Sequence, residues 1–185
     1  SAGGCFSGDT RVALADGRNL SFRELIDEEG RGVKNFCYTI APDDHIQLAP
    51  IENVRLTRKS TKVIKLVLDT DEEIISTPDH RFMLRDGTYK EAQHLTERDS
   101  LMPLYRQYSR IGKRITIEGY EMIFDSRDQR WTFTHMLADD HNLREGVYER
   151  TAGEHRHHRD FNKRNNNPAN IVRLSKEDHL AHHRR

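Results

Sequence analysis

Apolar residues in the first hundred positions fall in short runs that are separated by turn-forming residues. The runs are rich in β-branched and aromatic residues and lie at 11–14, 36–40, 54–56, 63–68 and 81–84. Asp16-Gly17 and Asp86-Gly87 are dipeptides that favour tight hairpin turns between strands. Because several short runs bounded by turn signals are typical of all-β folds, the pattern predicts an all-β module of many short strands.

One short helix interrupts this β pattern. Ser21, followed three residues later by Glu24, forms the capping-box signature of a helix N-terminus. It predicts a helix from Phe22 to Ile26, and a single helical turn is expected at 91–95. We therefore expect the β module to span residues 5–105 with little helix.

The second half of the chain has a different pattern. Residues 106–119 are basic and lack a clear period, so they are predicted to be a linker. The two strands of a hairpin are expected at 120–124 and 130–133, with a helix at 135–142 and a polar loop after it. No apolar run approaches the ~18–20 residues that a bilayer-spanning helix needs, which excludes a transmembrane protein.

Charge and histidine are distributed unevenly along the 185 residues. The chain holds 30 Lys+Arg and 30 Asp+Glu, but residues 1–105 carry a net charge of −4 and residues 106–185 a net charge of +4. Eight of the 11 histidines lie in the second part. This asymmetry indicates two modules, the second of which works near a polyanion. Cys5 and Cys37 cannot form a disulfide framework, which predicts a reducing, cytoplasmic setting, and Cys37 is expected to pack in the core.

Two motifs in the β module carry chemistry only when they are taken together. A lone cysteine such as Cys5 is most often a small buried residue, and a lone Thr77-x-x-His80 arises often by chance. Here Cys-Phe-Ser-Gly-Asp-Thr opens a strand, and a turn, a capped helix and Ser-Thr-Pro-Asp-His follow it. In this order the motifs resemble the start of an intein, which has the Hint fold of protein-splicing domains.

The resemblance implies self-cleavage chemistry that needs no cofactor. The Cys5 thiol would attack the carbonyl carbon of Gly4 and convert the amide to a thioester. His80 would protonate the leaving amine, because the reference pKa of histidine lies close to neutral, and Thr77 would hold the scissile peptide strained. Residues 1–4 would be a remnant of the flanking host protein, the extein.

A second dense motif begins at His157-His158-Arg159-Asp160. An asparagine-rich loop follows, with a strand at 170–174 and a helix that Ser175 caps. His179 and His183 are four residues apart, so they share one face of that helix at a spacing that suits two metal ligands. Strand, loop, strand and helix together predict an α+β unit of the ββα-metal type.

This run is similar to the HNH endonucleases in their His-His-x-Asp form. The resemblance implies that His157, His179 and His183 ligate a divalent Mg, Mn or Zn ion, with His182 as the competitor of His183. Three imidazoles favour a transition metal among these ions. His158 would be the general base that activates water.

The same resemblance assigns the loop and its surroundings. Asn170 would fix the loop and orient the base, and Asp160 is expected to have a structural role. The partner is double-stranded DNA, whose phosphates would be contacted by four cations of the motif: Arg159, Lys163, Arg164 and Arg173.

The combined prediction is a two-module protein. Residues 5–105 form an all-β Hint module, an incomplete horseshoe of short strands, which follows the extein remnant at 1–4. The linker at 106–119 leads to the HNH module at 120–185. The expected activities are formation of a Cys5 thioester for protein splicing and metal-dependent cleavage of DNA by an inserted homing endonuclease, which has lost activity in some such inteins.

Two alternatives remain at this point. One is a polymorphic toxin in which a Hint domain releases an HNH nuclease, and the other is a non-splicing HNH nuclease with a β accessory domain. The absence of a closing splicing motif between Leu95 and Tyr120 favours the intein. We expect the closing strands to come from a C-terminal intein fragment, as in a split intein or a truncated chain, and the flanking extein host to be the other protein partner.

Overall fold

The computed structural model describes most of the chain. The described residues are 11–43, 45–52, 64–67, 73–76, 78, 81–86, 88–101, 104–125 and 127–177. They divide into two compact units. Unit 1 holds the described residues of 1–12, 19–34 and 51–103, and unit 2 holds those of 13–18, 35–50 and 104–185. Among the described helices, none combines the length and apolarity needed to cross a membrane.

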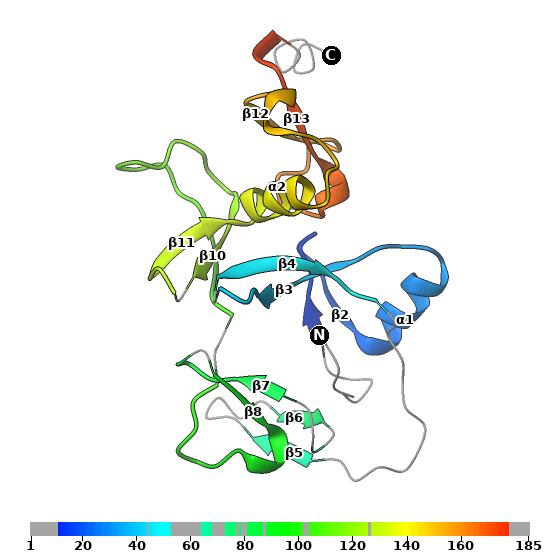
Figure 1. Cartoon of the computed structure of the whole chain (residues 1–185), viewed down its shortest axis with the longest axis vertical. Helices are drawn as coiled ribbons and strands as arrows, with labels where there is room; N and C mark the ends of the chain where they lie inside the picture. Colours follow the sequence, from blue (N-terminus) through cyan, green and yellow to red (C-terminus); the bar gives the residue numbers. More distant parts are fainter. Residues whose placement is uncertain are drawn as a thin grey trace. The chain divides into compact units, whose positions relative to one another are not determined.

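The described residues of unit 1 form short strand pairs and one capped helix (Figure 1). Its elements are β2 (Asn19–Ser21), α1 (Phe22–Gly30), β5 (Ile64–Val67), β6 (Glu73–Ser76), β7 (Arg81–Met83), β8 (Tyr89–Glu91) and the 3-10 turn η1 (Ala92–His94). β5 pairs with β6 and β7 with β8, both antiparallel, while β1 (Arg11–Ala13) pairs with β2. The predicted β-rich character of this part is confirmed.

The helix α1 begins as its capping box predicts. The Ser21 hydroxyl accepts the Glu24 backbone N–H, and the Glu24 carboxylate accepts the Ser21 backbone N–H, both at 3.2 Å. These two bonds satisfy donors that a helix N-terminus would otherwise leave without partners. The helix continues to Gly30, one turn beyond the predicted end at Ile26.

The described part of unit 2 contains three antiparallel sheets and one α-helix. β3 (Phe36–Ile40) pairs with β4 (Ile46–Pro50), and β12 (His155–His158) pairs with β13 (Ile171–Leu174). β9 (Arg106–Tyr108), β10 (Glu121–Asp125) and β11 (Arg130–Phe133) form a three-stranded sheet with β10 in the middle. The helix α2 (Thr134–Arg144) follows β11 directly, and η2 (Arg150–Ala152) and η3 (Pro168–Asn170) are 3-10 turns. The predicted hairpin and helix are confirmed.

The apolar core of unit 2 is drawn from segments that are far apart in the sequence. One cluster of buried side chains joins the turn after β1, both strands of the β3–β4 hairpin, β10, α2 and β13: Ala15, Phe36, Ile46, Leu48, Ile123, Leu137, Ala138 and Ile171. Ile123 and Ala138 have no exposed surface. Burial of such side chains is the main favourable term in folding. The core therefore fixes α2 against the β3–β4 hairpin, β10 and β13.

A buried carboxylate adds a polar contact to this core. Glu121 on β10 is 2% exposed. Its Oε1 accepts the Tyr38 hydroxyl and, at 3.0 Å, the Thr134 hydroxyl at the start of α2. Burial, together with the charge of Glu121, raises the pKa of Tyr38, which remains a neutral donor. The contact ties β3, β10 and α2 to one carboxylate.

The boundaries of the compact units differ from a simple division at residue 105. Residues 13–18 and 35–50, which the sequence pattern assigns to the first module, lie in one unit with 104–185. The predicted linker also contributes structure, because β9 pairs with β10 in the register Gln107 to Met122. β4 was not predicted, since Ile46–Pro50 contains a proline and no β-branched run. The expected strand at 54–56 lies outside the described residues.

Candidate active site

Two histidines of the predicted nuclease motif lie on one strand. In the β12–β13 hairpin His157 stands opposite Val172 and His158 opposite Ile171. The two residues are 5% and 8% exposed, respectively. Because neighbouring residues of a strand point to opposite faces, the two imidazoles face different surroundings. The His157 ring contacts Phe161 edge-on, with 5.1 Å between the ring centroids.

The loop after β12 is closed by the amide of Asn170. Its Oδ1 accepts the Asp160 backbone N–H at 3.2 Å, and its Nδ2 donates to Asp160 Oδ1 and to the Asn165 carbonyl, both at 2.9 Å. Its own carbonyl accepts the Arg159 N–H at 2.8 Å. Asp160 also accepts from Asn165 Nδ2 and from the Asn162 N–H, each at 2.8 Å. Asn170 thus fixes the loop, and Asp160 has a structural role within it.

The side chain that contacts His158 is a different asparagine. Nε2 of His158 lies 2.8 Å from Oδ1 of Asn166, which is 1% exposed. An imidazole that donates from Nε2 to an amide oxygen leaves Nδ1 as the unprotonated nitrogen in its neutral form. The contact expected from Asn170 toward the predicted base His158 is therefore made by Asn166 in this structure. The Asn166 backbone N–H donates to the Ala15 carbonyl at 2.9 Å, which anchors the loop to the core.

A third histidine lies beside His158 and was not predicted as part of the site. His135 is in the first turn of α2, and its ring centroid lies 6.0 Å from that of His158. Tyr120 and Phe133 also contact the His135 ring, at 5.5 Å and 5.1 Å between centroids. Burial, and secondly the neighbouring His158, lowers the pKa of His135 to about 4, so this imidazole is neutral near pH 7. No motif spacing could reveal it, because it comes from another element.

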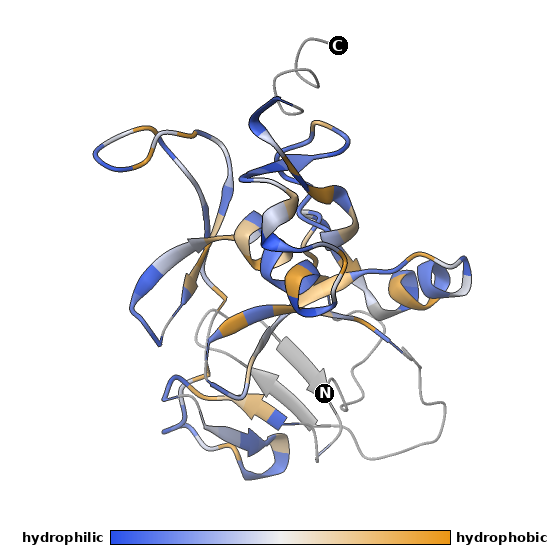
Figure 2. Ribbon diagram, turned by 45° about the horizontal axis from the view of Figure 1, so that its top comes forward, coloured by the Kyte–Doolittle hydropathy of each residue, from blue (hydrophilic) through white to orange (hydrophobic). Residues whose placement is uncertain are grey.

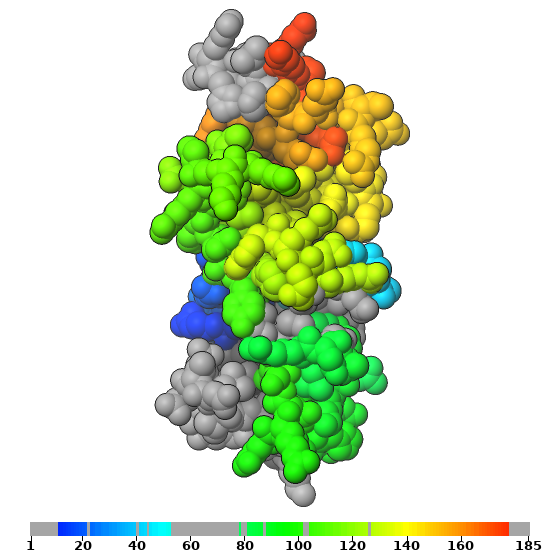
Figure 3. Space-filling model, turned by 90° about the vertical axis from the view of Figure 1, so that its left-hand side faces the viewer, coloured from blue at the N-terminus to red at the C-terminus, as the bar shows by residue number. Residues whose placement is uncertain are grey.

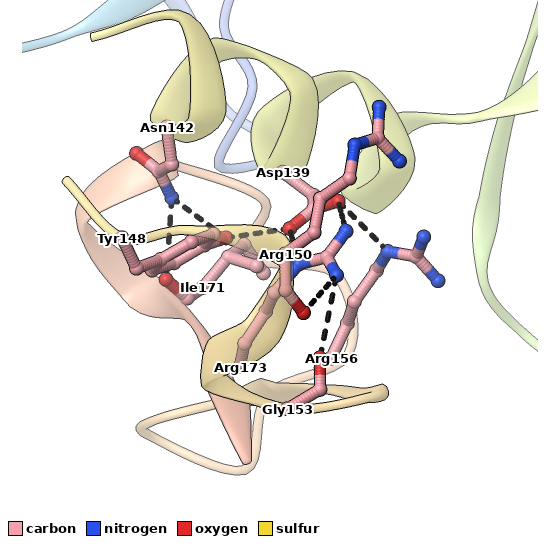
Figure 4. A network of polar contacts seen from close by, with 8 residues as sticks. All are labelled: Asp139, Asn142, Tyr148, Arg150, Gly153, Arg156, Ile171 and Arg173. Atoms are coloured by element: carbon pink, nitrogen blue, oxygen red, sulfur yellow. Dashed lines mark hydrogen bonds and ion pairs between the residues drawn. The ribbon is translucent and has the colours of Figure 1, made fainter. Parts of the chain in front are cut away.

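A buried ion-pair network holds the hairpin against α2 (Figure 4). Asp139 is 1% exposed and accepts from Arg173 at 2.8 and 2.7 Å, from Arg156 at 3.0 Å and from the Tyr148 hydroxyl at 2.7 Å. Burial alone would raise the pKa of Asp139, but these hydrogen bonds outweigh it and hold the pKa far below its usual value. Asn142, one turn later, donates to the Pro168 carbonyl at 2.9 Å.

This network bears on the predicted DNA contacts. Arg173 was expected to contact phosphate, but its side chain is 7% exposed and bonded in a fork to Asp139. Its remaining nitrogen donates to the carbonyls of Arg150 and Gly153, both at 3.3 Å. The geometry therefore gives Arg173 a structural role and speaks against a phosphate contact. The other three cations, Arg159, Lys163 and Arg164, are exposed.

Several predicted site residues lie outside the described residues. These are Cys5, Gly4, Thr77, His80, His179, His182 and His183. The thioester site and two of the three expected metal ligands therefore stay predictions. His157 is the member of the ligand set that the structure describes, and an imidazole donor there is compatible with a transition metal.

The described part of the chain also gathers three potential ligands that were not predicted. Nδ1 of His45 lies 3.0 Å from Asp125 Oδ2 and 3.6 Å from Asp128 Oδ2. The hydrogen bond to Asp125 raises the pKa of His45, as expected for an imidazolium between carboxylates. The His45 side chain is half-buried in this ion pair. Cys37, expected in the core, is half-buried, and burial raises the pKa of its thiol.

Comparison with known proteins gives two similar sequences. The whole chain is 56% identical, over 186 aligned positions, to a region of the DNA gyrase B protein from Synechocystis sp., and spans 17% of that protein's length. A 100-residue alignment covering 53% of the chain is 33% identical to the replication factor C small subunit of Methanocaldococcus jannaschii, of which it spans 5%. No protein-family model matches the chain. The chain thus corresponds to a small segment of each of these proteins.

Proposed function

We propose that this chain is the N-terminal region of an intein that carries an HNH homing endonuclease and resides in a gyrase B-type host. The observation that carries the proposal is the occurrence of similar segments in two proteins with different names, a gyrase protein and a replication factor protein. A segment that contributed to the function of one of these proteins would not be expected in the other. An insert that excises itself from its host can occur in both.

The splicing activity rests on residues of the first module. The Cys5 thiol loses its proton to solvent and its sulfur attacks the carbonyl carbon of Gly4, after which the Gly4–Cys5 C–N bond breaks to give a thioester and the amino group of Cys5. His80 donates the proton that this amine needs, and Thr77 holds the peptide. The C-terminal intein fragment supplies the closing strands, and the two host segments are the exteins.

The nuclease activity rests on the β12–β13 hairpin. His158 takes a proton from the attacking water through Nδ1, the nitrogen left free by the contact between Nε2 and Asn166. The water oxygen then attacks the phosphorus of the DNA backbone, the bond from phosphorus to the 3′ oxygen breaks, and the released 3′ oxygen takes a proton from solvent water. A divalent ion held by His157, His179 and His183 would neutralise charge on the phosphate and on the leaving oxygen. The closed Asn170 loop keeps the strand end in place for this chemistry.

A tagged fusion tests the splicing proposal. The chain is expressed behind a larger N-terminal tag, mixed with a C-terminal fragment copied from the gyrase B relative, and treated with dithiothreitol. We expect mass spectrometry to show release of the tag from the unsubstituted chain and from Cys37→Ala, the matched control, but not from Cys5→Ala. Equal release from Cys5→Ala, or no release with the fragment present, would overturn the proposal.

The nuclease is tested separately on a supercoiled plasmid that carries the gyrase B gene without the insert. Cleavage should require a divalent metal and should be lost in His158→Ala with metal binding retained. His155→Ala on the same strand serves as the matched control and should cut. Cleavage that persists with chelator, or in His158→Ala, would contradict this assignment without touching the splicing result.

A further inference from the structure

The segment between β9 and β10, residues 109–119, forms a hairpin-like arm that is closed by hydrogen bonds at its base and at its tip. Ser109 closes its base, because its N–H donates to the Tyr120 carbonyl at 2.8 Å and its hydroxyl donates to the Ile117 carbonyl at 2.7 Å. The tip is closed by two bonds between Gly112 and Ile115, at 3.1 and 2.8 Å. The segment projects from the three-stranded sheet of unit 2 in Figure 1, and hydrophilic and hydrophobic positions are interspersed along it in Figure 2.

The arm presents a group of exposed cations. Arg110, Lys113 and Arg114 are exposed, and none forms an ion pair with any residue in the described part of the chain. Glu118 is the one acidic residue of the segment. Ile111, near the tip, is 66% exposed. In the space-filling view of Figure 3 the side chains of this segment, in light green, stand out from the surface of the unit.

Contacts at its base fix the arm beside the candidate active site. Lys163 Nζ, from the loop after β12, donates to the Glu118 carbonyl at 2.9 Å. Gly119, beside that Nζ, has a φ of +80°, a backbone conformation that favours glycine. The Arg164 guanidinium stacks on the Tyr108 ring at 4.0 Å. Tyr120, at the end of the arm, lies 5.9 Å from the His158 ring, measured between centroids.

We propose that this arm is a DNA-binding element that lies along the duplex beside the bond to be cut, with Arg110, Lys113 and Arg114 on the phosphates. The inference rests on the proposed nuclease function. The major groove of B-DNA admits a two-stranded β-ribbon, and the arm extends such a strand pair, β9 with β10, and ends in the isolated bridge between Gly112 and Ile115. Exposed cations on the arm gain free energy by releasing counter-ions from the phosphates. Lys163 and Arg164 attach the arm to the loop after β12. Phosphate contacts made by the arm and by the loop would therefore keep a fixed spacing along the DNA.

A triple variant tests the arm in the full chain. Arg110→Ala, Lys113→Ala and Arg114→Ala are combined, and binding to the gyrase B-gene duplex is measured from 50 to 200 mM salt. The matched control combines Arg23→Ala, Arg81→Ala and Arg98→Ala, three exposed cations of unit 1, and changes net charge equally. We expect binding at least about tenfold weaker at 50 mM salt and a salt slope reduced by roughly 1 to 3, since each lost phosphate contact removes about 0.9. The control variant should keep the affinity and the salt slope of the unsubstituted chain.

A crosslinking variant provides a result that does not depend on affinity. Ile111→Cys, in a Cys5→Ala, Cys37→Ser background, should form a disulfide with a duplex that carries a tethered thiol on its backbone, whereas Glu97→Cys in unit 1 should not. Unchanged affinity and salt slope in the triple variant, or equal crosslinking at both positions, would overturn the proposal that the arm binds DNA. If the unsubstituted chain still cleaves the plasmid in that case, the proposed nuclease activity is retained without a role for the arm. DNA binding that depends on the arm, without any cleavage, would support the arm as a DNA-binding element and reject the nuclease activity.

Discussion

Nε2 of His158 contacts Oδ1 of Asn166 at 2.8 Å, whereas the Asn170 amide binds backbone and side-chain groups of the loop instead. Two asparagines therefore make the two sets of contacts, to the loop and to the imidazole, that were expected from Asn170 alone. Asn170 holds the loop closed, and Asn166 holds the imidazole. This division makes the roles separable by experiment.

Replacement of Asn166 should act on the chemistry more than on the fold. In Asn166→Ala the His158 ring loses the partner that selects its tautomer, so we expect kcat for plasmid cleavage to fall by about 10–100-fold with little change in KM for DNA. The pH–rate profile should also shift. Asn162→Ala, an exposed amide of the same loop, is the control, and an equal loss there would reject a specific role for Asn166.

Replacement of Asn170 should act on stability. Asn170→Ala removes three hydrogen bonds and leaves polar groups of a partly buried loop without partners, so the free energy of unfolding should fall by about 1–3 kcal/mol. Urea unfolding measures this. In a double-mutant cycle with Asp160→Ala the two losses should be far from additive, because both side chains belong to one network. Strict additivity would show that they act independently.

Asp139 should be among the costliest polar residues to replace. Asp139→Ala strands the buried Arg173 guanidinium, and loss of one partner of a buried pair costs about 3–5 kcal/mol. Asp140→Ala, the exposed neighbour, should stay within about 0.5 kcal/mol. Because the pKa of Asp139 is lowered by folding, its contribution is present above the unfolded pKa of about 3.9 and is lost as pH falls further. Comparable losses in the two variants at pH 7 would contradict this.

The His45 ion pair predicts the opposite pH dependence. Its pKa is raised by folding, so its contribution is fully present below the unfolded value of about 6.5 and is lost as pH rises through the folded value. The difference in melting temperature between the unsubstituted chain and His45→Gln should therefore be larger at pH 5.5 than at pH 8.5. His94→Gln, an exposed histidine of unit 1, should show no such trend. A difference that grows with pH would reject the ion pair.

Local signals were reliable where a single stretch of chain decides the structure. The Ser21–Glu24 capping box, the hairpin at 120–133 and the helix after it depend on neighbours in sequence, and all three were predictable. β9 was missed because Arg106–Tyr108 has no apolar alternation of its own and forms a strand through pairing with β10.

The candidate site was only partly predictable for a similar reason. His157, His158 and Asn170 stand in one motif, and the structure places them on one hairpin and its loop. Arg173 also stands in the motif, but its burial depends on Asp139, 34 positions earlier. His135 and the arm at 109–119 reach the same region from other elements, so no spacing within the motif could indicate them.

The discontinuous core of unit 2 has a consequence for the order in which the chain is made. Phe36 and Leu48 leave the ribosome long before Ile123 and Ile171, the side chains with which they form one buried cluster. Until β13 has been synthesised, the β3–β4 hairpin exposes apolar surface, because the later segments that cover it are not all present. Folding of the unit must then close long loops, which is slow. A fragment that begins near residue 104 would lack four of the eight core side chains that the described residues supply, so the second half should be recovered as a stable protein only when residues 13–50 are produced with it.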